Sequence, residues 1–289
     1  MSRLALATSR FALPGAHVAL ESHEDVDSPE IIAALATLGV EARLEIWDDP
    51  AVEWESYDVV VVRSTWGYAG VYEEFLTWAR ARANLVNPYE VIEYSTDKHY
   101  LGDLADQGFS VIETAFCEVG QTPQFPDGDF VVKPAVGAGS IDARRFGIAE
   151  TSSALEHVAS LHASGRCAVI QPYVTSIDEH GERGLIFFDG EFSHAVAKRA
   201  MLNVDPAVRD GDFRTRQMSS AVAEPAALDL ARQLLTGRFA DLAYARVDVV
   251  WTPQGWALME LELVEPALYL SYDHEAVQRC ARALARRVN

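Results

Sequence analysis

The sequence is poor in lysine, in cysteine and in positive charge as a whole. Its 289 residues include three lysines against 21 arginines, three cysteines, and a formal net charge of −19. Binding along nucleic acid requires a basic surface, so we expect no nucleic-acid partner. No apolar run approaches the ~20 residues of a membrane-spanning helix, and we expect no membrane partner. The apolar N-terminal stretch is too short for a signal peptide and predicts a cytoplasmic protein.

The cysteines and the common nucleotide motifs exclude further classes of site. Cys117, Cys167 and Cys280 are widely spaced and lack the paired spacing of zinc sites, so we predict reduced core residues. The turn after the first predicted strand lacks the Gly-x-Gly-x-x-Gly fingerprint of dinucleotide-binding domains, and the sequence contains no Walker A motif. With 49% hydrophobic residues, the composition is that of an ordinary globular protein with a sizeable core.

The first ninety residues alternate between predicted strands and helices. Strands are predicted at residues 3–8, 40–47 and 57–63, and helices at residues 28–39 and 73–82. The run of β-branched residues at 57–63 is continuous and does not alternate, which indicates a parallel strand buried on both faces. We therefore predict a small doubly wound, Rossmann-like α/β domain over residues 1–93.

Two further units follow, and no internal repeat or low-complexity linker separates them. Residues 94–170 predict a helix capped by Thr96 or Asp97, strands at 130–134 and 168–172, and a helix at 153–163. Residues 171–289 predict two hairpins, the first turning at Asp189 and Gly190, and a helix at 225–236. The predicted fold class is α/β with α+β character, in one compact molecule.

The second hairpin carries the clearest chemical signal. Arg246 and Asp248 face one way on its first strand, and Glu260 and Glu262 do so on its second. If the hairpin folds symmetrically about Gln254, Asp248 lies opposite Glu260. Like charges so placed destabilise a sheet, but they suit Mg²⁺, a hard cation that binds carboxylate and phosphate oxygens. The alternative is an exposed acidic sheet face that is paired with arginines.

The loop after Lys133 and the distribution of lysine give a second signal. Small residues at positions 137–140 allow backbone N–H groups to approach phosphate oxygens, although such turns are often ordinary loops. Arginine-rich codon usage explains the shortage of lysine, but it does not explain why Lys98, Lys133 and Lys198 remain. An ammonium group contacts a phosphate as a point charge, and a guanidinium replaces it poorly.

Taken together, these segments resemble the ATP-grasp ligases along the whole chain. The order and approximate spacing match at Lys98, residues 131–134 with the glycine-rich loop, residues 170–174, residues 246–248 and residues 260–262. Residues 62–68, 87–88 and 192–199 are similar to a glutathione-synthetase-like branch that includes the cyclo-ligase of D-cycloserine biosynthesis. Two positions depart from the pattern. Gly67 stands where this branch has an acidic residue, and Glu262 stands where many members have Asn.

The resemblance implies an ATP-grasp fold behind a pre-ATP-grasp domain, with ATP and two Mg²⁺ ions as cofactors. Lys98 and Lys133 would contact the α- and β-phosphates, residues 171–174 would receive adenine, and Asp178 or preferably Glu182 would bind the ribose. The implied ATP site comprises Lys98, Lys133, Gly137, Ala138, Gly139, Ser140, Gln171, Pro172, Tyr173, Val174, Asp178 and Glu182. The implied metal ligands are Asp248, Glu260 and Glu262. The residues that would balance charge during phosphoryl transfer are Lys198, Arg199, Arg214 and Arg246, although Arg199 and Arg214 could equally be surface charges.

The substrate is expected at the carboxyl ends of the N-terminal strands, where ligands of open α/β sheets bind. Arg63 could hold a carboxylate in bidentate fashion, or it could be a structural partner of an acidic residue. The predicted substrate residues are Arg63, Ser64, Thr65, Trp66, His23 and Asp25. We expect an ATP-dependent carbon–nitrogen ligase for a small amino-acid-like carboxylate, acting between two molecules or within one. A phosphotransferase and a noncatalytic ATP-binding module are the alternatives, and both a monomer and a homo-oligomer stay open.

Overall fold

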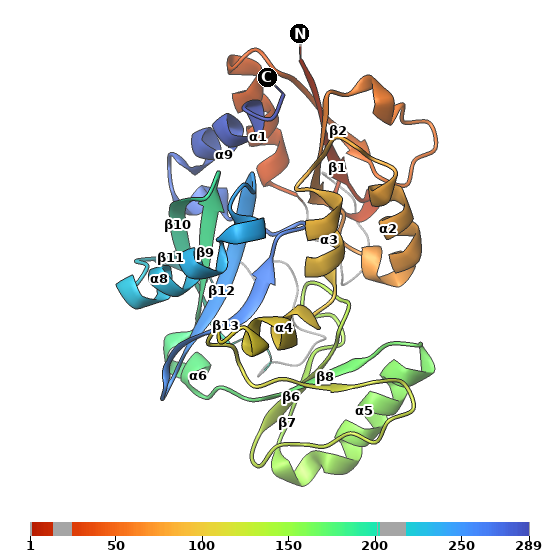
Figure 1. The fold of residues 1–289 in the computed structure, drawn as a ribbon, viewed down its shortest axis with the longest axis vertical. Helices are drawn as coiled ribbons and strands as arrows, with labels where there is room; N and C mark the ends of the chain where they lie inside the picture. The colour runs from red at the N-terminus through yellow and green to blue at the C-terminus, as the bar shows by residue number, and fades with distance from the viewer. Residues whose placement is uncertain (1, 14–24, 201, 203–217, 289) are drawn as a thin grey trace.

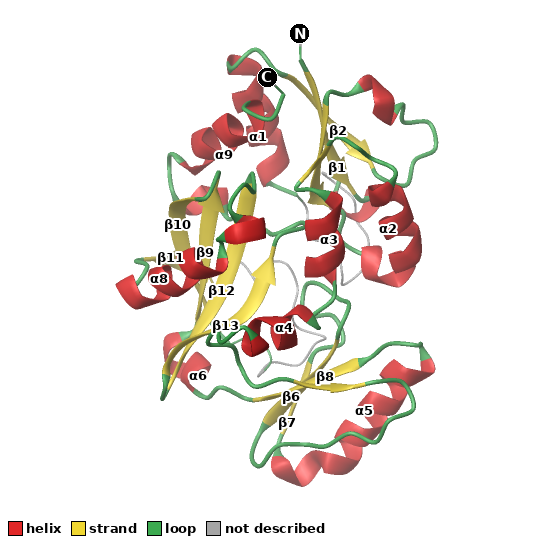
Figure 2. Cartoon of the chain, viewed as in Figure 1, coloured by secondary structure: helices red, strands yellow, loops and turns green. Residues whose placement is uncertain are grey.

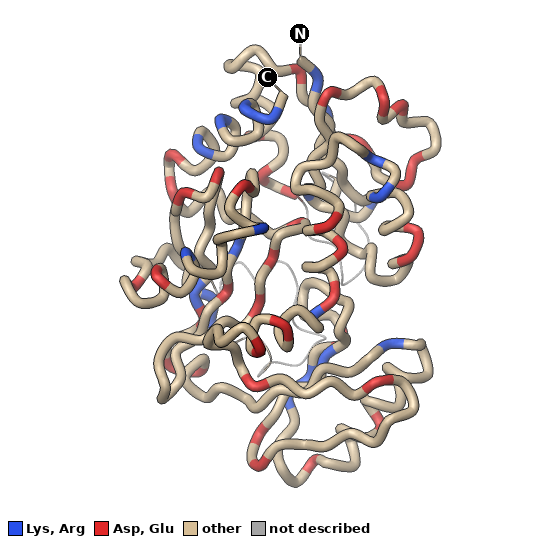
Figure 3. Tube along the Cα trace, in the orientation of Figure 1, with Lys and Arg blue, Asp and Glu red and all other residues tan. Residues whose placement is uncertain are grey.

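The described residues form three β-sheets (Figure 1, Figure 2). The computed structural model describes residues 2–13, 25–200, 202 and 218–288. The C-terminal five-stranded sheet lies between the N-terminal unit and the central unit in the view of Figure 1. Asp and Glu occur in all three units (Figure 3). In the described ranges, every helix is too short or too polar to cross a membrane.

The N-terminal unit is a parallel sheet in the order β2-β1-β3-β4. Its strands are β1 (Arg3–Thr8), β2 (Glu41–Ile46), β3 (Val59–Ser64) and β4 (Leu85–Val86), and its helices are α1 (Asp27–Thr37), α2 (Tyr72–Arg80) and α3 (Tyr89–Thr96). Every residue of β3 is buried, as its continuous β-branched run predicts. The sequence predicted that Ser28 caps α1, but the helix already begins at Asp27. Instead, the Asp25 carboxylate accepts the backbone N–H of Ser28 at 3.0 Å.

The central unit is an antiparallel sheet in the order β5-β8-β6-β7, with helix α5 packed against it. Its elements are β5 (Ala115–Cys117), β6 (Phe130–Pro134), β7 (Arg144–Phe146), α5 (Thr151–Ala163) and β8 (Ala168–Pro172). Helix α4 (Tyr100–Asp106) precedes them in the chain, but its buried residues pack in the apolar core of the C-terminal sheet. The predicted cap at Thr96 or Asp97 is wrong. Thr96 ends α3, and the Asp97 carboxylate accepts the backbone N–H of His99 at 3.1 Å just before α4 begins.

The C-terminal unit is an antiparallel sheet in the order β11-β10-β9-β12-β13. Its elements are α6 (Ser176–His180), β9 (Glu182–Phe188), β10 (Glu191–Lys198), β11 (Met218–Ala221), α8 (Pro225–Leu234), β12 (Tyr244–Thr252), β13 (Gly255–Glu262) and α9 (Ala276–Ala285). Both predicted hairpins are present. Each sheet therefore takes its strands from one of the three predicted units, except that β8 extends two residues past position 170.

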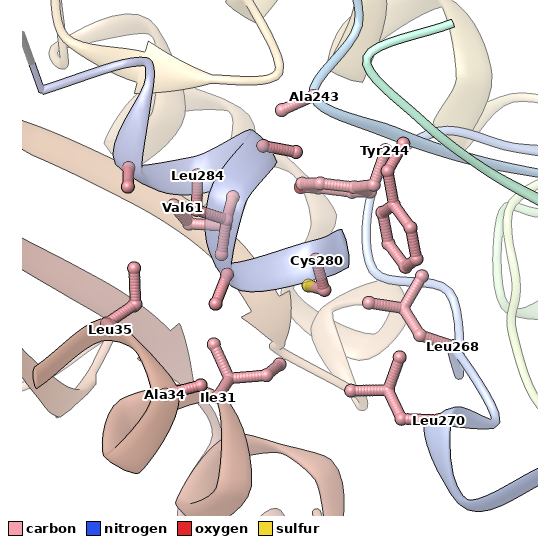
Figure 4. Packing of buried hydrophobic residues seen from close by; sticks show 14 of the residues in the cluster. Ile31, Ala34, Leu35, Val61, Ala243, Tyr244, Leu268, Leu270, Cys280 and Leu284 are labelled. Atoms are coloured by element: carbon pink, nitrogen blue, oxygen red, sulfur yellow. The ribbon is translucent and has the colours of Figure 1, made fainter. Parts of the chain in front are cut away.

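The C-terminal helix α9 returns to the N-terminal unit, a contact that the sequence analysis did not predict. Figure 4 shows Cys280 and Leu284 of α9 near Ile31 and Leu35 of α1, and all four side chains are buried in one apolar cluster. The first and third units therefore share a hydrophobic core, which restrains the position of one sheet relative to the other.

A second junction joins the N-terminal unit to the β12–β13 hairpin. The Asn87 side chain donates to the carbonyl oxygens of Tyr244 at 2.9 Å and Leu263 at 2.8 Å. The Tyr244 hydroxyl lies 2.8 Å from the carbonyl oxygen of Val264 and 2.7 Å from that of Val62 on β3. These bonds fix the base of the hairpin against the carboxyl end of the parallel sheet.

Candidate active site

The β12–β13 hairpin pairs Asp248 with Glu260 and Arg246 with Glu262. The predicted Asp248–Glu260 pair is therefore present, but its geometric origin differs from the assumed symmetry about Gln254. The hairpin closes between Thr252 and Gly255, and the register then shifts by one residue next to Val249. This β-bulge restores the pairing of Asp248 with Glu260.

Hydrogen bonds from preceding segments hold the outer edge of β13. The backbone N–H of Leu261 donates to the Tyr100 hydroxyl at 2.8 Å. The Ser95 hydroxyl donates to the carbonyl oxygen of Leu261 at 2.8 Å and accepts the N–H of Leu263 at 3.3 Å. Because these bonds occupy the edge of the strand, they fix the direction in which Glu260 and Glu262 project.

The three predicted metal ligands lie together. One carboxylate oxygen from each of Asp248, Glu260 and Glu262 lies within 4.8 Å of the others. Asp248 is 1% exposed, and the side chains of Glu260 and Glu262 are 28% and 29% exposed, so the cluster is partly shielded from solvent. Burial raises the pKa of Glu262 to about 7; the charges of Asp248 and Glu260 add to this rise, and Arg246 opposes it. An all-oxygen set of crowded carboxylates fits the ligand preference of Mg²⁺.

Each of these carboxylates contacts a cation. The ammonium of Lys98 lies 3.0 Å from Glu260, and that of Lys198 lies 2.6 Å from Asp248. Arg246 pairs with Asp248 at 3.0 Å and also contacts Glu262. Burial alone would lower the pKa of Lys198, but the charges of Asp248 and Glu182 raise it, so Lys198 stays protonated. The site thus joins two of the three lysines to the acidic cluster.

Most donors of Arg246 are already occupied. Its Nε and NH2 groups contact Asp248 and Glu262, and its NH1 group donates to the carbonyl oxygen of Ala267 at 3.0 Å. Arginine carries five N–H groups, so within the described part of the chain one N–H of NH1 is left for another acceptor. Arg246 can therefore orient the carboxylates and still donate a single hydrogen bond.

Lys133 differs from the other two lysines. It lies near the end of β6, and within the described residues no carboxylate oxygen comes within 4.0 Å of its ammonium. Burial lowers its pKa, Lys98 contributes to the same effect, and Glu260 opposes it. A desolvated ammonium without a close carboxylate is well placed to attract an anion.

The glycine-rich loop follows β6 directly and is connected to Lys98 at its base. Gly139 and Ser140 have φ angles of 64° and 60°, in the left-handed region that favours glycine. The ammonium of Lys98 donates to the carbonyl oxygen of Gly137 at 2.7 Å. The backbone N–H of Lys98 donates to the carbonyl oxygen of Ala135 at 3.1 Å. The loop, which includes Ala138, therefore lies beside the charged cluster.

The predicted adenine segment leads from β8 into α6. Val174 packs on an apolar cluster that combines Val250 of β12 and Ala257 and Met259 of β13 with Ile177 of α6 and Ile112, which precedes β5. The Gln171 side chain donates to the Thr114 hydroxyl at 2.9 Å, while Pro172 is the last residue of β8. An apolar surface of this kind is the environment that a purine ring requires.

The two predicted ribose acceptors have different surroundings. Asp178 accepts a hydrogen bond of 2.6 Å from the Tyr173 hydroxyl, and the Arg145 guanidinium lies 3.6 Å from the centre of the Tyr173 ring. Glu182 instead pairs with Lys198, opposite it on the neighbouring strand. Burial raises the pKa of Glu182, and Lys198 opposes this rise. Both assignments stay predictions.

Arg63 and Asp25, predicted to bind substrate, are parts of a buried ion-pair network. Arg63 is 3% exposed and lies 2.9 Å from Asp27 and 3.6 Å from Asp25. It also donates to the carbonyl oxygen of Pro266 at 2.8 Å. Burial would raise the pKa of Asp25, but Arg63 and hydrogen bonds from Ser28 lower it. These contacts match the structural alternative for Arg63.

The other predicted substrate residues follow at the end of β3. Ser64 donates to the Thr8 hydroxyl at 2.8 Å, and the indole N–H of Trp66 donates to the carbonyl oxygen of Glu265 at 3.2 Å. The buried hydroxyl of Thr65 has no partner among the described residues. Gly67, which departs from the family pattern, has a φ angle of 98° that an acidic residue would adopt only with strain.

The described part of the structure does not bring three of the predicted site residues to the carboxylate cluster. His23 and Arg214 lie outside the described residues. Arg199 is exposed directly after β10, beyond the buried Lys198. Their roles stay predictions.

Two residues that the sequence analysis missed also shape the site. A Cβ atom at Gly184 would lie 3.1 Å from Asp248 Oδ1 and 3.1 Å from Val196, so glycine leaves room for the carboxylate. A lone glycine inside a predicted strand is a signal of such close approach. Glu265 follows β13, and burial, with help from Glu262, raises its pKa to about 8. The signal for Glu265 in the sequence is its position three residues after Glu262.

Comparisons of the sequence with known proteins give two matches. The sequence profile described as "D-cycloserine synthetase DcsG, N-terminal domain" matches residues 4–87. The chain is 34% identical over 312 aligned positions to "Cycloserine biosynthesis protein DcsG" of Streptomyces lavendulae, covering 100% of this chain and 99% of that protein.

Solved structures confirm the predicted fold. A crystal structure of D-cycloserine synthetase DcsG matches with a TM-score of 0.86 and 32% identity over 100% of both chains. D-alanine–D-alanine ligase from Bacillus anthracis, in complex with ATP, matches with a TM-score of 0.66 over 100% of this chain and 97% of its own, and at 14% identity it supports the fold alone. The RimK domain protein ATP-grasp from Sphaerobacter thermophilus matches with a TM-score of 0.65 and 15% identity over 99% of each chain. The chain therefore belongs to the DcsG family of ATP-grasp enzymes and is an ATP-dependent ligase.

Proposed function

We propose that this ligase is a cyclo-ligase, which activates the carboxylate of a small amino-acid-like substrate and closes a carbon–nitrogen bond within the same molecule. The observation that carries the proposal is the convergence of Lys98, Lys198 and Arg246 on three clustered carboxylates, with Lys133 beside them. Full-length similarity to a cycloserine biosynthesis protein supports the intramolecular reaction.

The lysines would bind the phosphates of ATP. Lys133 has no close carboxylate in the described chain, and Lys98 would exchange its contact with Glu260 for a phosphate oxygen. Backbone N–H groups of residues 137–140 would approach the same phosphates. Adenine would contact the apolar surface at Val174 and Met259. Asp178 or Glu182 would accept the ribose hydroxyls.

Asp248, Glu260 and Glu262 would hold Mg²⁺, two ions in our proposal. The metal supplies positive charge to the β- and γ-phosphates. Burial and mutual repulsion of these carboxylates would favour the binding of a cation between them, and the raised pKa of Glu262 supports this. Gly184 leaves the space that Asp248 occupies.

Catalysis would proceed in two steps. An oxygen of the substrate carboxylate bonds to the γ-phosphorus, the bond from that phosphorus to the bridging oxygen breaks, and ADP leaves. A nitrogen of the same substrate then bonds to the acyl carbon, loses a proton, and expels phosphate. The remaining N–H of Arg246 would donate to the developing oxyanion. Lys198, with Arg199 and Arg214, would balance the phosphoryl charge.

The substrate that we propose is a serine-like amino acid with a nitrogen on its side-chain oxygen, because closing an acyl–nitrogen bond there forms the ring that cycloserine contains. It would lie at the carboxyl end of β3, where Thr65 offers a buried hydroxyl and Trp66 an indole ring. The ion pairs of Arg63 would support this surface from beneath.

Incubation of the enzyme with ATP, Mg²⁺ and each enantiomer of O-ureidoserine, without another amine, tests the proposal. We expect stoichiometric ADP and phosphate release with a cyclic product for one enantiomer. An absolute requirement for a second amine would contradict ring closure and indicate a two-substrate ligase. A phosphorylated product that survives hydroxylamine would indicate a phosphotransferase, and absence of ATP turnover with every substrate would indicate a binding module.

A further inference from the structure

Three side chains of metal-binding type meet outside the nucleotide site. His99 lies between α3 and α4, Glu118 directly follows β5, and Cys167 directly precedes β8. The Nε2 atom of His99 lies 2.9 Å from a carboxylate oxygen of Glu118 and 3.8 Å from the Cys167 sulfur, and this sulfur lies 3.4 Å from the same oxygen. Cys167 is therefore not the simple core cysteine that the sequence predicted.

The separations fit a tetrahedral metal ion. With Zn–N and Zn–O distances of about 2.0–2.2 Å and a Zn–S distance of about 2.3 Å, ligand atoms lie roughly 3.3–3.7 Å apart. The three observed separations of 2.9, 3.4 and 3.8 Å bracket this range. A side-chain adjustment of a few tenths of an ångström therefore gives each atom a bonding position around one ion.

Neighbouring groups hold His99 in the orientation of a metal ligand. The Asp97 carboxylate lies 2.6 Å from its Nδ1 atom, and the Phe116 ring stacks on the imidazole with 4.3 Å between ring centres. A carboxylate on Nδ1 directs Nε2 toward the metal in many zinc sites. The His99 side chain is 41% exposed, so an ion from solvent can reach it.

We propose that His99, Glu118 and Cys167 bind a thiophilic divalent cation, Zn²⁺, with solvent in the fourth position. The nitrogen–oxygen–sulfur set suits zinc, whereas the all-oxygen set of the hairpin suits magnesium. The two sites are separate, and the inference does not depend on the substrate that the enzyme uses.

The site would connect three segments at the base of the glycine-rich loop. The backbone N–H of Ala135 donates to the carbonyl oxygen of Cys167 at 3.0 Å. The backbone N–H of Lys98 donates to the carbonyl oxygen of Ala135 at 3.1 Å. Asp97, which orients His99, also forms a β-bridge with Val136. A bound ion therefore cross-links the segments from which Lys98 and the loop extend.

Titration of the intact enzyme with Co²⁺ in excess Mg²⁺ tests the site, because Mg²⁺ occupies the hairpin carboxylates and only a thiolate ligand gives sulfur-to-cobalt charge-transfer absorption. We expect one Co²⁺ per chain with this absorption, and its loss on addition of Zn²⁺. Cys167→Ser should abolish the band, and Cys117→Ser, a matched change at a nearby thiol, should retain it.

A second variant tests how His99 is oriented. Asp97→Asn should weaken Zn²⁺ binding by about 10–100-fold, the usual effect of losing a carboxylate behind a histidine ligand. Thermal unfolding of each variant checks that it is folded. Absence of thiolate absorption in the wild type, or unchanged Zn²⁺ affinity in folded Cys167→Ser, would overturn the proposal and leave His99 as an ion-pair partner of the two carboxylates.

Discussion

Replacement of Glu260 by Gln should destabilise the enzyme when nucleotide is absent, in addition to abolishing turnover. Glu260 was expected from the sequence to repel Asp248, so that removing its charge would relieve strain. The structure instead places the Glu260 carboxylate 3.0 Å from Lys98. Burial would raise the pKa of Glu260, but Lys98 and Lys133 lower it to about 2. The neutral amide leaves two cations without their common counter-charge.

The size of the effect follows from this pKa. A fall from the ordinary value of 4.5 to about 2 corresponds to about 3 kcal/mol at 1.36 kcal/mol for each pKa unit. Because the folded pKa is depressed, this stability is fully present above pH ~4.5 and is lost as the pH falls toward 2. With an unfolding entropy of about 2.1 cal/mol/K per residue, the chain of 289 residues should lose about 5 °C in Tm.

Thermal unfolding at pH 8 measures this loss, and two further variants control it. Glu262→Gln should cause no loss, because burial already raises the pKa of Glu262 to about 7 and makes its charge costly. Lys98→Met should restore most of the stability of Glu260→Gln, because it removes one of the unpaired cations. A wild-type Tm for Glu260→Gln, or strictly additive effects of the two changes, would refute the reasoning.

Three further results are expected. Lys133→Ala should weaken ATP binding by about 1.5–3 kcal/mol, or roughly 10–150-fold, in calorimetry; an unchanged affinity would exclude a phosphate contact. Arg63→Ala should lower unfolding free energy by about 3–5 kcal/mol, because it leaves Asp27 buried and unpaired; a raised substrate KM with an unchanged Tm would instead indicate substrate binding. Glu265 has a folded pKa of about 8, raised by burial and Glu262, so its ionisation costs stability as pH rises from about 4.5 to 8. Glu265→Gln should therefore raise Tm more at pH 9 than at pH 6, and an equal change at both would contradict the assigned pKa.

Local patterns in the sequence were sufficient for the elements that carry the site. The run of buried valines predicted β3, the alternation around Asp248 and Glu260 predicted the hairpin, and the position of Lys133 predicted a cation before the glycine-rich loop. Each of these depends on residues close together in the chain, where strand periodicity and turn length determine which side chains share a face.

Tertiary structure decided which groups from distant segments meet. The sequence offered no way to pair Lys98 with Glu260, to bury Arg63 beside Asp27, or to bring Cys167 to His99. Such contacts depend on how the sheets pack and on where the helices return, so no local periodicity encodes them. The amino-acid sequence alone thus determined the kinds of chemical group and the strands that present them. Packing between the units determined which charges neutralise one another, because burial and short distance set the strength of each pair.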